Sequence, residues 1–116
     1  MGILSDELLK QLLKFRSERD WQQFHTVRNL SASMVVEASE LLECFQWARD
    51  SELSRIVVDE RAHIEEELAD VAILLAYLCS DLGVDIDAAV RRKVITNAEK
   101  YPIDRARGSS RKYDKL

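Results

Sequence analysis

Apolar residues recur at intervals of three or four positions along most of this chain, a spacing that places them on one side of an α-helix. The first such segment begins after Ser5, a typical helix-capping residue, and extends to about Arg19. Residues 20–28 contain aromatic side chains without a helical period, so we expect a structured loop there. Long helices are therefore the expected elements.

Two more helices are expected in the middle of the chain. Asn29 is a suitable cap for a second helix, which extends to about Arg49 before a polar linker over residues 50–54. A third helix covers about residues 59–82 and stops at Gly83, because glycine is the usual residue at a helix C-terminus.

A fourth helix begins at Asp85 or Asp87 and ends at Tyr101, because Pro102 disfavours helical backbone in the residue before it. Only three glycines and one proline occur in 116 residues, too few for the many turns of a β-sandwich or barrel. Four helices joined by short segments predict an all-α, four-helix bundle-like domain over residues 1–102.

Charge is distributed unevenly along the sequence. The net charge of −4 and the isoelectric point of about 5.2 argue against general binding of polymeric nucleic acid. Residues 103–116 nevertheless carry five basic and two acidic side chains, so this tail has a net charge of +3 and residues 1–102 have −7. Such a basic C-terminal tail either closes on an anion or is simply a solvated terminus.

Membrane and secretion signals are not expected in this sequence. No apolar stretch approaches the length that spans a membrane, and the first residues lack the layout of a signal peptide. Cys44 and Cys79 lie inside helical patterns without a partner at zinc-binding spacing, which is typical of core residues in a reducing compartment. We therefore expect a cytoplasmic protein.

Carboxylates occupy the apolar side of the second expected helix. At about 100° per residue, Glu37 lies at the centre of this side and Glu40 at its edge. The neighbours of Glu37 on that side are apolar: Leu30, Met34 and Leu41. A buried carboxylate without a partner is unfavourable, so this placement indicates a specific role.

The third expected helix repeats the pattern, with Glu67 central on its apolar side and Asp70 at the edge. The two helices also share one spacing: Glu37-x2-Glu40-x6-Trp47 and Glu67-x2-Asp70-x6-Tyr77. Residues three apart are neighbours on a helix surface, so each helix offers a pair of carboxylates. Packed face to face, the two pairs would surround one point.

Four facing carboxylates repel one another unless protons or cations enter between them. Their oxygens suit a hard divalent cation, and magnesium would keep waters and take further ligands from phosphates. Alternatively, the acids form ion pairs with Lys or Arg at the rim of the bundle, or bind calcium or magnesium without turnover. A di-iron centre needs a second Glu-x-x-His motif beside Glu60-Arg-Ala-His63, and the sequence has none.

The acidic motifs and several other segments of the chain resemble those of a known family. Residues 37–47 (EASELLECFQW) and 67–71 (ELADV) are similar to the signature of the all-α nucleoside triphosphate pyrophosphohydrolases of the MazG-like superfamily, Glu-x-x-Glu followed on the next helix by Glu-x-x-Asp. Residues 18–25 (ERDWQQFH), 28–30, 93–102 and 109–113 (SSRKY) resemble its dCTP pyrophosphatase branch. The likeness covers nearly the whole chain.

This resemblance implies hydrolysis of a (d)NTP, with dCTP or a modified dCTP as the expected substrate, to the monophosphate and pyrophosphate. It implies a magnesium-dependent homotetramer built from two dimers. The implied metal ligands are Glu37, Glu40, Glu67 and Asp70, and Glu37 and Glu40 are the implied catalytic groups. The implied substrate-binding residues are Trp21, His25, Trp47, Lys93, Asn97 and Tyr101.

Geometry adds two expectations of its own. If the second helix continues to about Arg49, Trp47 lies seven residues, about 10 Å, beyond Glu40 on the same side, a plausible distance from metal-bound phosphates to a base. The fourth helix presents three polar residues on one face, at i, i+4 and i+7: Lys93, Asn97 and Lys100.

Two positions depart from the resemblance. Leu74 stands where close relatives commonly have tyrosine, and Leu12 stands where some dCTP-specific relatives have histidine. Both changes remove polar groups, so strict preference for cytosine is not implied. The expected chemistry is attack of water on a phosphorus, with one carboxylate accepting the proton. The alternative function is a non-enzymatic helical oligomerisation module or a divalent-metal-binding module.

Overall fold

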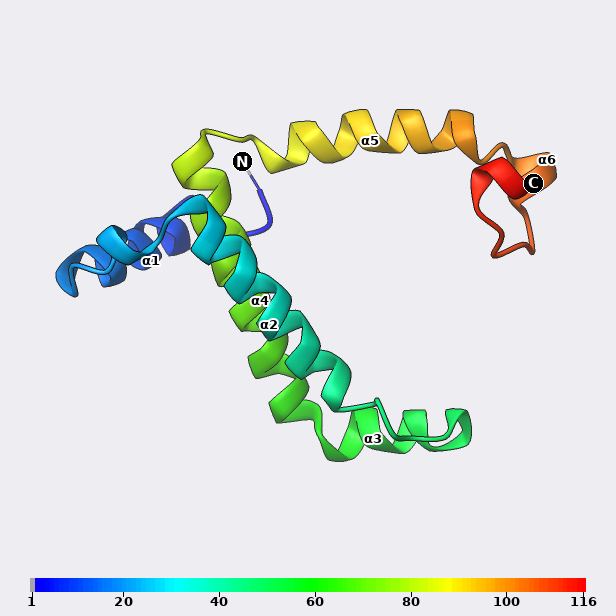
Figure 1. Cartoon of the computed structure of the whole chain (residues 1–116), viewed down its shortest axis with the longest axis horizontal. Coiled ribbons are helices and arrows are strands. Elements are labelled where there is room, and N and C mark those ends of the chain that lie inside the picture. Colours follow the sequence, from blue (N-terminus) through cyan, green and yellow to red (C-terminus); the bar gives the residue numbers. More distant parts are fainter. Residues whose placement is uncertain (1) are drawn as a thin grey trace.

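A computed structural model describes residues 2–116 of the chain, and that part is all-α, as expected (Figure 1). Four helices correspond to the expected ones: α1 (Asp6–Glu18), α2 (Val27–Glu43), α4 (Arg61–Leu82) and α5 (Ile86–Lys100). Two shorter helices, α3 (Leu53–Asp59) and α6 (Ile103–Ala106), were not expected. Single turns of 3₁₀ helix complete the order: η1 (Gln22–Phe24), η2 (Asp50–Glu52) and η3 (Tyr113–Lys115).

Capping residues fix most helix ends where the sequence predicts them. The Ser5 hydroxyl accepts the Leu8 N–H at the start of α1, at 3.2 Å. The Asp85 carboxylate accepts the Ala88 N–H at the start of α5, at 3.1 Å. Gly83 ends α4 with a φ of 65°, a left-handed conformation that glycine adopts without strain. These three boundaries are confirmed.

The start of α2 is different from the prediction. Thr26, not Asn29, is the cap, because its hydroxyl accepts the Asn29 N–H at 3.1 Å. Asn29 lies in the first turn, where its side-chain amide donates to the Phe24 carbonyl at 2.9 Å and ties η1 to α2. The expected loop is thus short and held by side-chain hydrogen bonds.

The end of α2 also differs, since the helix stops at Glu43 rather than near Arg49. The Glu52 carboxylate accepts the Arg49 N–H at 3.1 Å and starts a new turn, η2, which leads directly into α3. This local capping competes with continued helix, and the aromatic residues before it are weak helix formers. Trp47 therefore lies in a turn and is 89% exposed, so its expected place on the helix is wrong.

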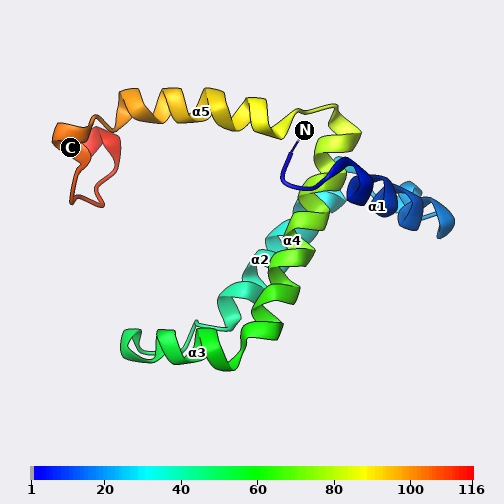
Figure 2. The same ribbon diagram turned by 180° about the vertical axis from the view of Figure 1, so that it is seen from behind.

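Helices α2 and α4 run antiparallel and side by side along their lengths (Figures 1 and 2). α1 packs across the C-terminal half of α4, and α3 lies at the opposite end of the pair. The buried centre consists of Leu30, Tyr77 and Leu78, against which other apolar residues pack: Leu12, Leu13, Met34, Ile73 and Leu74. Most of the packing is thus between α2 and α4, with α1 at one end.

The rest of the chain is extended. α5 leads away from the α2–α4 pair and carries α6 and η3 at its far end (Figure 1). The radius of gyration is 17.7 Å, whereas a compact chain of this length has about 13 Å. The accessible surface is 9161 Å², against about 6,500 Å² for a compact monomer of this mass. One chain therefore does not close a four-helix bundle, and the bundle arrangement stays a prediction.

The C-terminal tail folds back on the end of α5 rather than on the α2–α4 pair. The Tyr113 ring meets the Tyr101 ring edge-on at 6.1 Å, and the Lys100 ammonium lies 4.8 Å from the centre of the Tyr113 ring. The boundary expected at residue 102 remains a prediction. Among the described residues, no helix has the length and apolar character needed to cross a membrane.

Candidate metal and nucleotide site

Three carboxylates converge between α2 and α4. Glu37 on α2 and Glu67 and Asp70 on α4 each offer an oxygen, and these oxygens lie within 4.8 Å of one another. Glu67 is 7% exposed, Glu37 is half-buried and Asp70 is exposed. The group is therefore enclosed by the helix pair on one side and open to solvent on the other.

Glu40 lies near this group, on the next turn of α2. Its carboxylate lies outside the group of converging oxygens but close enough to influence the pKa of Glu37 and of Glu67. Burial, supported by the charges of the neighbouring acids with Glu40 first, raises the pKa of Glu37 to about 7. Burial and Glu40 also raise the pKa of Glu67, while His63 acts in the opposite direction.

Within the described part of the chain, the acids have no strong cationic partner. None of the described lysines or arginines forms an ion pair with them. The exposed His63 ring comes within 3.8 Å of a Glu67 oxygen, one helical turn away. One oxygen of Glu37 and one of Glu67 are buried without a hydrogen-bond partner among the described residues. Crowded carboxylate oxygens without partners fit a hard cation such as Mg²⁺ and do not fit the ion-pair alternative.

A cavity of about 250 Å³ opens beside the carboxylates. Its aromatic and aliphatic wall consists of Phe15, Trp21, Ile73, Leu74 and Tyr77, and its polar lining of His25, Ser33, Glu37 and Asp70. The cavity thus places an apolar wall next to two of the acids. Such a combination suits a ligand with a flat ring at one end and phosphates at the other.

The apolar wall is built from residues at the end of α1 and from α4. The Phe15 and Trp21 rings meet edge-on at 5.7 Å, and Phe15 lies on α1 just before the loop that carries Trp21. The His25 ring lies 5.3 Å from the Tyr77 ring, and its Nδ1 atom is buried without a hydrogen-bond partner. Burial, together with the charge of Arg16, lowers the pKa of His25.

The structure gathers some expected site residues and leaves others outside. Trp21 and His25 lie with the acids in the cavity. Trp47 follows the C-terminal end of α2, whereas Trp21 precedes its N-terminal end, so 17 residues of helix, about 25 Å, separate their positions. A single chain therefore cannot hold one base between both tryptophans.

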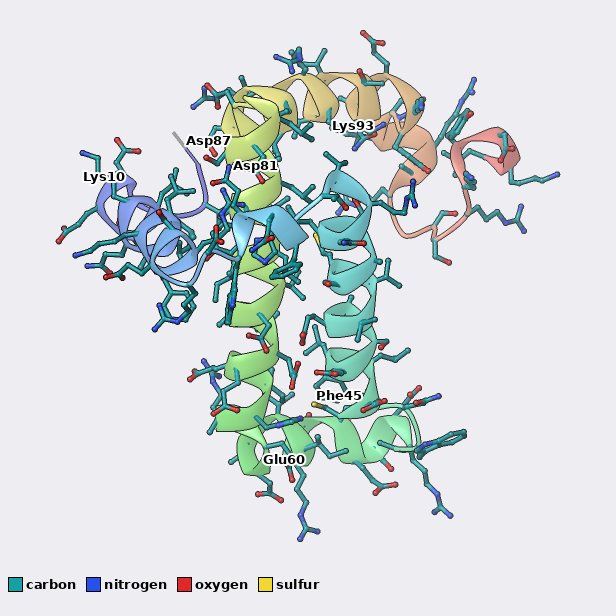
Figure 3. The ribbon with its side chains drawn as sticks, turned by 60° about the vertical axis from the view of Figure 1, so that its left-hand side comes forward. Lys10, Phe45, Glu60, Asp81, Asp87 and Lys93 are labelled. Atoms are coloured by element: carbon teal, nitrogen blue, oxygen red, sulfur yellow. The ribbon has the colours of Figure 1, made fainter. Side chains whose placement is uncertain are left out.

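The expected residues of α5 also lie outside the cavity of their own chain. Asp70 precedes the end of α4 by twelve residues, about 18 Å of helix, and α5 then leads away. Figure 3 shows Lys93 at the end of the molecule where α5 leaves α4, with Phe45 and Glu60 at the opposite end. Asn97 and Tyr101 lie still farther along α5.

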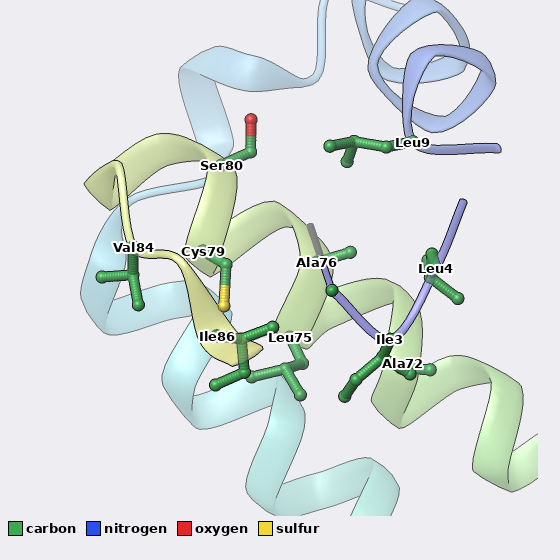
Figure 4. Close-up of a pocket in the computed structure, with 11 residues that line it drawn as sticks. Ile3, Leu4, Leu9, Ala72, Leu75, Ala76, Cys79, Ser80, Val84 and Ile86 are labelled. Atoms are coloured by element: carbon green, nitrogen blue, oxygen red, sulfur yellow. The ribbon is translucent and has the colours of Figure 1, made fainter. Parts of the chain in front are cut away.

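A second cavity lies on the other side of α4 (Figure 4). It has a volume of about 30 Å³, and none of the described residues that line it carries a charged side chain. Leu4 and Leu9 line it from the N-terminal region, and Leu75 and Cys79 line it from α4. Without acids or bases this cavity carries no hydrolytic chemistry, so the carboxylate cavity is the candidate site.

Sequence reasoning did not identify several residues of the cavity. The spacing shared by the two expected helices includes Tyr77, and this was the sequence feature that could have placed Tyr77 in the site. Phe15 and Ser33 gave no signal, because the contact of α1 with α4 that brings Phe15 to the site is tertiary. Sequence reasoning also did not place His63 beside the acids, although its spacing of four residues from Glu67 was a signal that could have done so.

Comparison with known proteins defines the family. The model of the MazG-like family matches residues 32–116, which include both acidic motifs, α5 and the tail. This chain belongs to the MazG-like family. The matched region therefore includes residues 103–116 as well as the helices.

Curated relatives agree with this assignment. The chain is 45% identical over 105 residues to dCTP pyrophosphatase 1 of Rattus norvegicus and 46% identical to dCTP pyrophosphatase 1 of Homo sapiens. These alignments cover 89% of this MazG-like chain but 62% of each relative, so the chain spans less than two thirds of their length.

A solved structure has the same fold over nearly its full length. The crystal structure of a pyrophosphatase from Archaeoglobus fulgidus superposes with a TM-score of 0.81 and is 39% identical in sequence. The match covers 88% of this chain and 98% of the archaeal chain.

Proposed function

We propose that this protein is a nucleoside triphosphate pyrophosphohydrolase that converts a (d)NTP to the monophosphate and pyrophosphate. The observation that carries the proposal is the cavity in which Glu37 and Asp70 adjoin an aromatic wall. The names of the relatives, dCTP pyrophosphatase 1 and an archaeal pyrophosphatase, support it. The substrate we propose is dCTP or a modified dCTP.

The proposed metal ligands are Glu37, Glu40, Glu67 and Asp70, which fit Mg²⁺ through their crowded oxygens. When bound, the ion supplies charge neutralisation at the phosphates and acidifies water. Glu37 or Glu40 accepts the proton of the attacking water. Trp21 holds the base against the apolar wall, which keeps the phosphates at the acidic end of the cavity.

We further propose that the site is completed by another copy of the chain in a tetramer made of two dimers. The accessible surface exceeds that of a compact monomer by about 2,700 Å², and obligate interfaces bury areas of this size. In such an assembly Lys93, Asn97 and Tyr101 of one copy reach the phosphates and sugar held by another, and Trp47 reaches the base. Light scattering should give about 54 kDa, four times 13.4 kDa.

The proposed compartment is the cytoplasm, where nucleotide pools are found. Cys44 and Cys79 are free thiols, as a reducing compartment maintains them. Leu74 is part of the apolar wall, and Leu12 packs against the buried centre beside it. With leucine at both positions, we expect preference among pyrimidine bases to be weaker than a site with more hydrogen-bonding groups would give.

The direct test is product analysis with a panel of canonical and 5-modified (d)NTPs. With Mg²⁺ we expect monophosphate and pyrophosphate in equal amounts, and no products in EDTA. Release of phosphate and a diphosphate would contradict the proposed bond cleavage. Stabilisation by Mg²⁺ without turnover of any nucleotide would instead identify a metal-binding module.

A further inference from the structure

A buried guanidinium lies directly behind the nucleotide cavity. Two of the described residues with almost no exposure are charged, Glu67 and Arg16, and the Arg16 side chain lies under the aromatic wall. Arg16 is 3% exposed. This burial is notable because the buried centre of the chain contains few residues. Burying a cation is costly unless its partners are well placed, so the contacts of Arg16 need an explanation beyond packing.

Arg16 is held by a bidentate ion pair with Asp81 near the end of α4. Its two terminal nitrogens donate to the two carboxylate oxygens at 2.9 and 2.8 Å. The same hydrogen bonds lower the pKa of Asp81, so the pair stays charged at neutral pH. Two parallel hydrogen bonds fix the plane of the guanidinium as well as its position.

The fixed plane lies against Tyr77. The central carbon of the guanidinium is 4.6 Å from the centre of the Tyr77 ring, within the range of a cation–π contact. The Tyr77 hydroxyl donates to the Leu12 carbonyl at 2.9 Å, which anchors the other end of this side chain. The Tyr77 ring is therefore held at its face and at its hydroxyl, and it lines the cavity.

Arg16 also touches the opposite part of the wall through its backbone. Its carbonyl accepts the Trp21 N–H at 3.1 Å, at the point where α1 ends and the loop begins. The Tyr77 ring in turn contacts the His25 ring, whose Nδ1 atom is buried without a partner. One residue outside the cavity thus connects the three ring-bearing side chains that face the proposed base: Trp21, His25 and Tyr77.

We propose that Arg16, locked by Asp81, is a positioning residue for the nucleotide base: its side chain holds the Tyr77 ring, against which the His25 ring lies, in the arrangement that receives the base. This inference rests on the proposed function. An apolar pair could tie α1 to α4 as firmly, because replacing a buried ion pair by apolar groups is often neutral for stability. What the flat, bidentate guanidinium adds is orientation of the ring beneath it.

The test is the double variant Arg16→Met with Asp81→Leu, which removes both charges together and leaves neither unpaired. We expect the KM for dCTP to rise about fivefold or more, since contacts to a base contribute about that much or more. The kcat should stay within about twofold, because the carboxylates are untouched. Inhibition by pyrophosphate, which has no base, should be unchanged, and this readout separates loss of base positioning from general damage.

Two further variants keep the test sharp. Arg55→Met with Asp59→Leu removes an exposed ion pair on α3, 3.3 Å long, and should leave KM unchanged. Arg16→Lys keeps the charge beside Asp81 but loses the flat fork, so we expect a folded protein with KM raised about twofold or more.

Unchanged KM in a folded double variant, or a folded lysine variant with wild-type KM, would overturn the proposal. A fall in kcat at constant KM, or weaker inhibition by pyrophosphate, would also overturn it. If wild-type protein run in parallel releases no pyrophosphate, the proposed function has failed. If it is active and the variants match it, the inference about Arg16 alone has failed.

Discussion

The α2–α4 pair differs in packing from the arm, which is formed by α5 and the tail (residues 86–116). The pair is packed along its length and encloses acids between its helices. The arm extends into solvent and exposes apolar residues, including Val90, Val94 and Ile95. The pair makes a site within one chain, whereas the arm has surface to bury and no described element of its own chain to bury it on.

Charge follows the same division. Residues 86–116 carry nine basic and four acidic side chains, a net charge of +5. Because the whole chain has a net charge of −4, residues 1–85 have a net charge of −9. Acids gathered in one region attract the basic arm of another copy as well as a cation. On the proposed function, the acidic body (residues 1–85) holds the metal, and the arm contributes to activity only in the assembled protein.

The largest effect should come from the carboxylates of the body. Glu40→Gln or Asp70→Asn should lower kcat/KM by about a thousandfold or more, because a metal ligand supplies several kcal/mol of charge stabilisation. Glu65→Gln is the matched control on α4, since Glu65 is exposed and pairs with Arg61 at 2.8 Å. Pyrophosphate release by a Glu40→Gln enzyme at the control's rate would contradict the metal-site proposal.

The next effect separates body from arm. Lys93→Ala with Asn97→Ala should lower activity by at least about tenfold through lost contacts to phosphate. Co-expression of this arm variant with Asp70→Asn should recover about a quarter of wild-type activity, because a quarter of randomly assembled sites combine an intact body with an intact arm of another copy.

Co-expression of Asp70→Asn with Glu40→Gln is the control for that recovery, because both changes lie in the body and no site can be intact. If the arm served its own chain, the arm mixture would recover nothing. That result would mean that Lys93 and Asn97 act in the site of their own chain or do not belong to the site.

Much of this division could be predicted from the sequence. Capping by Ser5, Gly83 and Asp85 depends on neighbouring residues, so these helix ends were correct. The acids were found because helical periodicity alone places them on one side of each helix. The end of α2 could not be found, because no glycine or proline marks it and the competing turn depends on a Glu52 contact.

The cavity wall was harder to predict than the acids. Phe15 and Trp21 meet Ile73 and Tyr77 only because α1 crosses α4, which periodicity within a helix does not determine. The direction of α5 has the same origin. It follows Gly83 and Asp85 at a sharp turn, and the sequence gives the turn but not its angle.

A smaller effect concerns the tryptophans. Trp21→Ala should raise KM about fivefold to a hundredfold, the range expected from base stacking. Trp47→Ala should raise KM as well but leave the melting temperature unchanged, because the side chain is 89% exposed in one chain. A fall in melting temperature with unchanged KM would assign Trp47 to the interface between copies and remove it from the base.

The smallest effect is on the pH dependence of stability in EDTA. Because the pKa of Glu37 in the folded protein is raised to about 7, the folded state holds a proton that the unfolded state releases above about pH 4.5. Stability should therefore fall as pH rises from about 4.5 to 7 and level off above that. A melting temperature in EDTA that rises across this range would contradict the crowding of acids.

The central claim is that the acids between α2 and α4 form a cation site rather than a structural ion-pair network. Thermal unfolding of wild type and Asp70→Asn at pH 8, in EDTA and in Mg²⁺, tests it most directly. In EDTA the variant should melt at the same or a higher temperature than wild type, because one repelling charge is gone. Mg²⁺ should raise the melting temperature of wild type and have much less effect on the variant. A variant that melts lower than wild type in EDTA, together with a wild type indifferent to Mg²⁺ with and without nucleotide, would contradict the account.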